Sequence, residues 1–249
     1  MIDILSLESY CNELLSVAAF NDYCPNGLQV EATTQVERLM LGVTACQSLI
    51  EAAEAWGADT LLVHHGYFWK GEGEPLRGIK ANRVGALFRQ RTSLLAYHLP
   101  LDAHADYGNN RQLGERLGLI PAAPISDQSL IWETRLPEPT TPQALAQRIG
   151  DRLGRVPTHI APDGRPLTRI GWCSGAAQGA IEEAAELGLD GYISGEISEQ
   201  TVHLARELGI HYYAAGHHAT ERYGVQALGA HLAEKFSLEY RFVDVENPV

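Results

Sequence analysis

The chain has 249 residues, enough for one large domain or two small ones with a substantial core, so its stability requires neither disulfides nor a structural metal. Its formal net charge of -12 and its scattered lysines and arginines make nucleic acid an unfavourable partner for the outer surface. Four cysteines without a CxxC pair, no signal-peptide pattern and no apolar stretch of membrane-spanning length predict a cytoplasmic protein without membrane contact.

The first half of the chain has the alternating pattern of a β-α-β protein. An apolar strand is predicted over Arg38–Val43, a helix over Gln47–Trp56 and a second strand over Thr60–Val63. Another helix, Asn82–Arg91, leads into a strand over Ser93–Tyr97. Polar residues follow the last two strands. Open α/β sheets carry their sites at the carboxyl ends of parallel strands, so these residues are candidates for a site.

The second half repeats this plan in register. Ile170–Gly175 aligns with Leu41–Cys46, and continuing the alignment puts Glu196 in the place of His65. We therefore predict an α/β fold of two similar, interlinked α/β units that arose by internal duplication, with sites at strand carboxyl ends. The alternative is that the similarity is only the one that any two β-α-β units share.

The boundary between the two units is predicted near residue 120. Residues 1–120 are expected to form the first unit, and residues 121–249 a connector followed by the second unit; the boundary is approximate and leaves room for the units to interlink. The connector, Ile120–Pro142, is rich in proline, threonine and serine and has one predicted strand, Ser129–Trp132. A short helix is predicted over Pro142–Leu153.

Three histidines and two carboxylates that follow predicted strands form a candidate metal site. They are His64, His65 and Asp102 in the first unit and His217 and Glu221 in the second. Adjacent imidazoles in one tight turn point in different directions, which suits two ions better than one. His217 and Glu221 are four residues apart, so one helical turn puts both on the same face. Each residue alone has an ordinary structural explanation; the combination indicates divalent metals, which a carboxylate can bridge.

Three further residues are candidates for proton transfer. His98 and His218 neighbour the predicted ligands in the sequence, and Glu196 takes the place of a histidine ligand in the second repeat. Metal sites need such groups, either to hold the ligands through hydrogen bonds or to move protons. A purely structural role for the same residues is the alternative. The chain has no GxSxG sequence and no cysteine with a recognisable histidine partner, so covalent nucleophilic catalysis is not indicated.

Five segments carry the motifs of a known family. They are DYCPNGLQV at 22–30, VHHGYFWKG at 63–71, HLPLDAH at 98–104, GEISEQ at 195–200 and AAGHHATER at 214–222. Through these motifs the chain resembles the Ngg-interacting-factor-three-like proteins, also called GTP cyclohydrolase I type 2 homologues, and most closely their bacterial YbgI type. The resemblance covers nearly the whole chain.

The resemblance implies a dinuclear metal centre with two divalent ions per chain, for which Fe, Mn and Zn are the preferred candidates. It assigns His64 and Asp102 to one ion and His65 and His217 to the other, with the two imidazoles of the first unit interchangeable, and Glu221 as the bridge. It also implies a toroidal homo-hexamer, built as a trimer of dimers, with the metal sites facing an inner cavity.

Two functions from different classes follow from the resemblance. One is a dinuclear metal-dependent hydrolase, similar to a GTP cyclohydrolase, in which activated water attacks a purine nucleotide such as GTP or a related compound. The other is a non-enzymatic metal-binding hexameric ring that acts in metal handling or in the response to DNA damage or stress. A third, DNA binding through the ring, requires Lys70, Lys80 and Arg83 to cluster against the acidic net charge.

Overall fold

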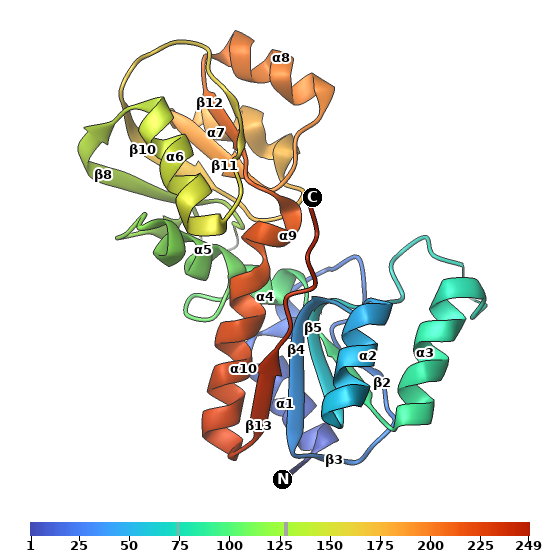
Figure 1. Ribbon diagram of the computed structural model, residues 1–249. Helices are drawn as coiled ribbons and strands as arrows, with labels where there is room; N and C mark the ends of the chain where they lie inside the picture. The colour runs from blue at the N-terminus through green and yellow to red at the C-terminus, as the bar shows by residue number, and fades with distance from the viewer. Residues whose placement is uncertain (74, 127–128) are drawn as a thin grey trace. The chain divides into compact units, whose positions relative to one another are not determined.

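The computed structural model describes residues 1–73, 75–126 and 129–249. It divides the chain into two compact units, each with helices around one main β-sheet (Figure 1). The predicted α/β fold class is therefore confirmed. Among the described residues, no helix is both long and apolar enough to cross a membrane.

The observed units differ in their boundaries from the division predicted near residue 120. Unit 1 comprises Met1–Gly108 and Gly224–Glu246, and unit 2 comprises Asn109–Tyr223 and Asn247–Val249. The C-terminal segment 224–246 belongs to unit 1 because its helix contributes apolar side chains to that unit's core and its strand pairs with that unit's sheet. The two units thus interlink through a return of the chain to unit 1.

The sheet of unit 1 has five strands in the order β13-β4-β5-β6-β2. The first four are parallel to one another, and β2 is antiparallel to β6. Two short strands, β1 and β3, pair separately. The strand bounds are β1 Ile2–Asp3, β2 Gly27–Val30, β3 Gln35–Val36, β4 Arg38–Thr44, β5 Thr60–His65, β6 Ser93–Ala96 and β13 Glu239–Phe242.

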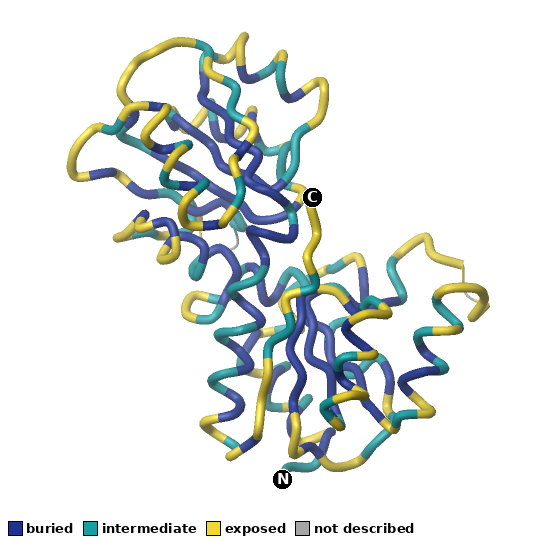
Figure 2. The backbone as a smooth tube through the Cα atoms, viewed as in Figure 1, coloured by how far each residue is buried: buried dark blue, intermediate teal, exposed yellow. Residues whose placement is uncertain are grey.

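Helices cover both faces of this sheet, because alternate strand residues point to opposite sides. Leu39 and Leu41 of β4 pack in one core with α1 and α10, whereas Met40 packs in a second core with α2 and α3. The central strands are buried along most of their length, while the outer sides of the helices are exposed (Figure 2). The helix bounds are α1 Ile4–Leu14, α2 Gln47–Trp56, α3 Gly78–Gln90, α4 Leu99–Ala103 and α10 Arg222–Phe236.

The sheet of unit 2 has six strands in the order β7-β8-β10-β11-β12-β9, of which β10, β11 and β12 are parallel. One core holds side chains of α5 and α6, and the other holds side chains of α7 and α8. The strand bounds are β7 Ala123–Pro124, β8 Trp132–Thr140, β9 Thr158–Ile160, β10 Leu167–Trp172, β11 Gly191–Ser194 and β12 His211–Ala214. The helix bounds are α5 Asn109–Leu117, α6 Pro142–Leu153, α7 Ile181–Glu186, α8 Glu199–Leu208 and α9 His217–Thr220.

The segment predicted as a connector with one strand at Ser129–Trp132 contributes two strands, β7 and β8, to the sheet of unit 2, and the predicted strand overlaps β8 only at Trp132. Strand β8 pairs antiparallel with β10 over most of its length, and β7 pairs with β8. The two prolines of β8, Pro137 and Pro139, lie opposite a shift in the register of β10 between Leu167 and Arg169. A missing backbone N–H group is tolerated at such an irregularity. Residues 127 and 128 of the expected connector lie outside the described residues.

Candidate metal centre

His64 and His65 are the last two residues of β5, not residues beyond its end as predicted. The centroids of their rings are 4.5 Å apart. Nδ1 of His64 donates to the carbonyl oxygen of Tyr97 at 2.9 Å, and Nδ1 of His65 is 3.2 Å from the hydroxyl oxygen of Thr44. Because Nδ1 is engaged in both rings, Nε2 is the nitrogen that each presents as a ligand.

Asp102 lies within the short helix α4, one turn after β6, and its carboxylate is buried. Its Oδ1 atom is 3.5 Å from Nε2 of His64. Two donors bound to one ion at ~2.1 Å each lie roughly 3.0 to 3.5 Å from one another in tetrahedral or octahedral geometry. His64 and Asp102 are thus spaced as two ligands of one ion.

The structure also brings His98 to the histidines of unit 1. One ring nitrogen from each of His64, His65 and His98 lies within 4.8 Å of the other two. His98 caps the N-terminus of α4, and its Nδ1 donates to Oδ1 of Asp22 at 2.7 Å. Burial raises the pKa of Asp22, but hydrogen bonds from His98 and Asn26 outweigh it and lower the pKa to about 2. Asp22 is the first residue of the first family motif, but nothing in the sequence pattern around it predicts a role.

In unit 2, His217 and Glu221 meet as their spacing predicted. His217 begins the one-turn helix α9 and Glu221 directly follows it. Nε2 of His217 is 3.1 Å from Oε2 of Glu221, again the separation of two donors on one ion. The Glu221 side chain is 4% exposed. A buried carboxylate needs a cation or hydrogen bonds to compensate its charge, so this pair suits a metal.

Glu196, a predicted proton-transfer residue, contacts a predicted ligand. Its Oε1 atom accepts a hydrogen bond of 2.7 Å from Nδ1 of His217. Burial lowers the pKa of His217, but the carboxylates of Glu221 and Glu196 together raise it to about 9. A carboxylate on Nδ1 fixes the orientation of the ring and leaves Nε2 for a metal. The geometry therefore gives Glu196 the task of holding His217.

Two glycines leave space around this pair. A Cβ atom on Gly175, where φ is +65°, would collide with the carboxylate of Glu221. A Cβ atom on Gly195 would lie 2.6 Å from the carbonyl oxygen of Gly175 and 2.7 Å from Cα of His217. The chain after β11 therefore approaches the backbone of His217, and the chain after β10 approaches the side chain of Glu221, each at a distance that only glycine permits.

His218 is buried on the same turn, and its backbone N–H donates to the carbonyl oxygen of Val249 at 3.0 Å. Taken separately, unit 1 gathers His64, Asp102, His65 and His98, and unit 2 gathers His217, Glu221 and Glu196. Both groups consist of imidazole and carboxylate donors, the ligand types that divalent iron, manganese and zinc accept. The residues present in each unit thus fit a metal.

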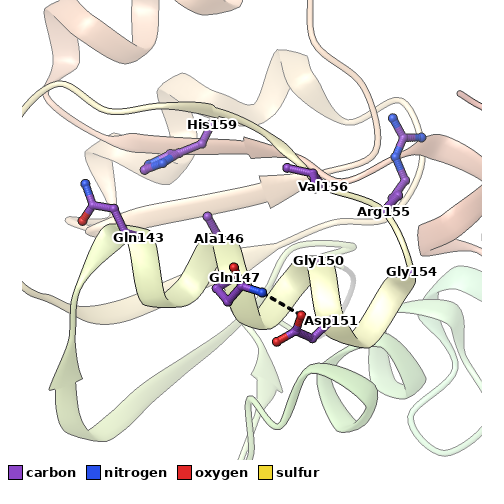
Figure 3. Close-up of a pocket in the computed structure, with 9 residues that line it drawn as sticks. All are labelled: Gln143, Ala146, Gln147, Gly150, Asp151, Gly154, Arg155, Val156 and His159. Carbon is purple, nitrogen blue, oxygen red and sulfur yellow. Dashed lines mark hydrogen bonds between the residues drawn. The ribbon is translucent and has the colours of Figure 1, made fainter.

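A separate cavity of about 460 Å³ lies in unit 2 between α6 and the segment 154–159 (Figure 3). Gln147 and Asp151 of α6, which are joined by a hydrogen bond of 2.7 Å, line one side, and Val156 and His159 lie across from the helix. None of the predicted ligands is among the described residues that line it. This cavity is not the candidate metal centre.

Comparison with known proteins places the chain in a family. The model of the Duf34/NIF3 (NGG1p interacting factor 3) family matches residues 2–248. A protein of Allochromatium vinosum named GTP cyclohydrolase 1 type 2 homolog is 52% identical, covering 100% of this chain and 98% of that protein. A protein of Vibrio cholerae with the same name is 51% identical, covering 98% of this chain and 99% of that protein.

Solved structures agree. One described as protein ybgI, of unknown function, superposes with a TM-score of 0.96 at 46% identity, and the match covers 100% of both chains. Reduced HcgD from Methanocaldococcus jannaschii superposes with a TM-score of 0.85 at 21% identity, covering 99% of this chain and 98% of that one, and shares the fold. The family predicted from the motifs is confirmed: the chain belongs to the Duf34/NIF3 family.

Proposed function

We propose that this chain is a metal-dependent hydrolase with a dinuclear centre whose ligands are His64, His65, Asp102, His217 and Glu221. One observation carries the proposal. In unit 1, Nε2 of His64 lies 3.5 Å from a carboxylate oxygen of Asp102, and in unit 2, Nε2 of His217 lies 3.1 Å from a carboxylate oxygen of Glu221. In both rings Nδ1 is hydrogen-bonded to a different oxygen atom. Rings held in this way present Nε2 to a metal.

The family resemblance suggests how the ligands divide. His64 and Asp102 are assigned to one ion, and His217 with His65 to the other. Glu221, whose carboxylate has two oxygens to offer, is assigned as the bridge. Donors of this kind suit iron, manganese and zinc, and availability decides among such metals in many proteins.

The name of the relatives suggests the substrate class. Both quoted relatives are named as homologues of GTP cyclohydrolase 1 type 2, so we propose a purine nucleotide or a related compound with a hydrolysable ring. Paired divalent ions lower the pKa of water toward neutrality. The chain's own residues then have two tasks: Glu196 keeps the ring of His217 in place, and a nearby base takes up the proton that the water releases.

The test uses wild-type protein, Glu221→Ala and the matched control Glu199→Ala, each loaded with iron(II), manganese(II) or zinc(II). Glu199 is exposed on α8, where its carboxylate contacts His203. Each protein is incubated with GTP, and mass spectrometry is used to look for formate and a ring-opened product. We expect product from wild type and from Glu199→Ala and none from Glu221→Ala.

The absence of product from wild type with metal occupancy confirmed would overturn GTP hydrolysis. Tight metal uptake without turnover of other cyclic or phosphorylated metabolites would favour the non-enzymatic metal-binding ring. The homo-hexamer remains a prediction of the family resemblance, and light scattering of the purified protein measures it directly. The cytoplasmic location likewise remains a prediction.

A further inference from the structure

His98 lies at the predicted centre without being one of the five predicted ligands. Its ring centroid is 5.1 Å from that of His64 and 5.8 Å from that of His65. The edge of the Trp69 ring also contacts it, with ring centroids 4.9 Å apart and planes at 85°. The side chain of His98 is only 14% exposed. The imidazole is thus confined beside the two adjacent histidines of β5.

Asp22 hydrogen-bonds to this imidazole, and both oxygens of its carboxylate accept hydrogen bonds. Its Oδ1 atom accepts from Nδ1 of His98 at 2.7 Å and from the backbone N–H of Tyr23 at 2.6 Å. Its Oδ2 atom accepts from Nδ2 of Asn26 at 2.8 Å and from the backbone N–H of Leu99 at 2.9 Å. The Asp22 side chain is 3% exposed. Four hydrogen bonds stabilise the ionised form, which only accepts, so the hydrogen between the two residues belongs to Nδ1 of His98.

The same loop also fixes the backbone of His98. Oδ1 of Asn26 accepts a hydrogen bond of 2.7 Å from the backbone N–H of His98. Asp22 therefore hydrogen-bonds to the ring of His98, and Asn26 hydrogen-bonds to its backbone. A ring held at both points keeps its orientation without reorganisation when a substrate arrives, which is the condition for efficient proton transfer.

Nδ1 of His98 is hydrogen-bonded in the same way as Nδ1 of the three predicted histidine ligands. Each of them has Nδ1 hydrogen-bonded to an oxygen atom, and so does His98. A ring with its proton on Nδ1 carries its lone pair on Nε2. Like His217, and unlike His64 and His65, His98 has a carboxylate of its own unit as its partner on Nδ1. A carboxylate in this position also stabilises the ring when Nε2 gains a proton.

We propose that Asp22 is a positioning residue that keeps the proton of His98 on Nδ1, so that Nε2 of His98 accepts the proton of the reacting water. The proposal rests on the proposed function. As the water oxygen forms its bond to the substrate carbon, one O–H bond breaks and the proton moves to Nε2. The same proton then passes to the ring nitrogen whose bond to that carbon breaks, which returns His98 to its starting state.

The first measurement is the tautomer of His98, by long-range ¹H–¹⁵N correlation spectra of metal-free and zinc-loaded protein labelled with ¹⁵N-histidine. The spectrum of His98→Gln assigns the signal. We expect the Nδ1–H form in wild type and a shift toward the Nε2–H form in Asp22→Asn, with no change in the matched control Asp3→Asn, whose carboxylate caps α1. An Nε2–H ring in wild type overturns the proposal even if Asp22→Asn does not fold.

The second measurement is turnover of whichever substrate wild type hydrolyses. We expect Asp22→Asn to lower kcat by about 10²-fold to 10⁴-fold with little change in KM or metal content. Full activity in a folded Asp22→Asn variant overturns proton acceptance by His98. If wild type itself has no turnover, the proposed function fails together with the proton-transfer step, while the tautomer still decides whether Asp22 positions the ring.

Discussion

Asp59 of unit 1 and Asp190 of unit 2 make the same pair of hydrogen bonds. Oδ2 of Asp59 accepts from two consecutive backbone N–H groups at the start of β4, both at 2.8 Å. Oδ2 of Asp190 accepts from two consecutive backbone N–H groups at the start of β10, again both at 2.8 Å. The backbone carbonyl oxygen of Asp59 also accepts from the N–H of Ser93, the first residue of β6, and that of Asp190 accepts from the N–H of His211, the first residue of β12. This repeated geometry supports the internal duplication predicted from the sequence.

Each aspartate is therefore expected to stabilise its unit. Asp59→Ala and Asp190→Ala should each lower the free energy of unfolding by about 1–3 kcal/mol, because two backbone N–H groups lose a charged acceptor. Chemical denaturation followed by circular dichroism measures the loss. Asp151→Ala is the control, since within the described part of the chain this exposed aspartate accepts only from the side chain of Gln147, one turn away on α6. A loss equal to that of the control would contradict the prediction.

Gly175→Ala is expected to disturb the metal site of unit 2. The added Cβ atom would displace the carboxylate of Glu221, and the backbone φ of +65° would be strained by about 1–3 kcal/mol. Metal content and the free energy of unfolding should both fall, as measured by elemental analysis and denaturation. Gly179→Ala, four residues on, brings its added Cβ within 4 Å of none of the described residues and should leave both unchanged. Equal metal content in the two variants would argue against Glu221 as a ligand.

Glu196→Gln tests whether the carboxylate on Nδ1 of His217 supports metal binding. An amide oxygen is a weaker acceptor than a carboxylate, so metal affinity should drop about 10–100-fold. Competition with a coloured chelator gives the affinity. The control is Glu199→Gln, because the side chain of Glu199 is 89% exposed. If the two variants bind metal equally well, Glu196 has no part in holding the ligand.

Acid should destabilise unit 2 through His159. Burial, together with the nearby His211, lowers the pKa of His159 below its ordinary value. The unfolded chain then takes up a proton near pH 6.5 that the folded chain does not, so the free energy of unfolding falls as the pH falls through about 6.5. His159→Phe keeps a ring against Tyr213, which stacks on His159 at 4.3 Å, but removes the proton. The variant should lose less stability than wild type between about pH 7.5 and about pH 5.5.

A proline or a glycine made three helix ends predictable from the sequence: the end of α2 and both ends of α6. The predicted ranges of α2 and α6 agree with the observed ones at both ends. Gly57 and Gly154 follow these helices in the left-handed conformation, and Pro142 occupies the first turn of α6. Each of these residues has a conformational preference that acts locally, so its effect is visible without the rest of the fold.

Strands at or next to the edges of the sheets were not predictable in the same way. Strand β8 contains two prolines, and β9 lies in a segment that reads as loop because of its own prolines and glycines. Strand β13 has only four residues, with no alternation of buried and exposed side chains. These segments become strands because a neighbouring strand offers hydrogen-bond partners, which is a tertiary effect that local pattern does not encode.

The donors of the site could be predicted from their chemistry, but their supports could not. His217 and Glu221 share a helical turn, so their spacing of four residues predicted that the two side chains lie on the same face. Asp22 and His98 are 76 residues apart, and no periodicity links them. The acceptor for His64 is a backbone carbonyl oxygen, which every residue possesses. Hydrogen-bonding partners of this kind emerge only once the strands are in place.

The return of the chain to unit 1 after residue 223 has a consequence for synthesis on the ribosome. Nearly all of unit 2 emerges before α10 and β13 exist, so unit 2 completes its sheet first, although unit 1 begins at Met1. A nascent chain that ends at Tyr223 has His217 and Glu221 within a completed sheet unit. In that chain β4 lacks its partner β13 and presents an open edge, a surface prone to pairing with other chains until residues 224–246 arrive.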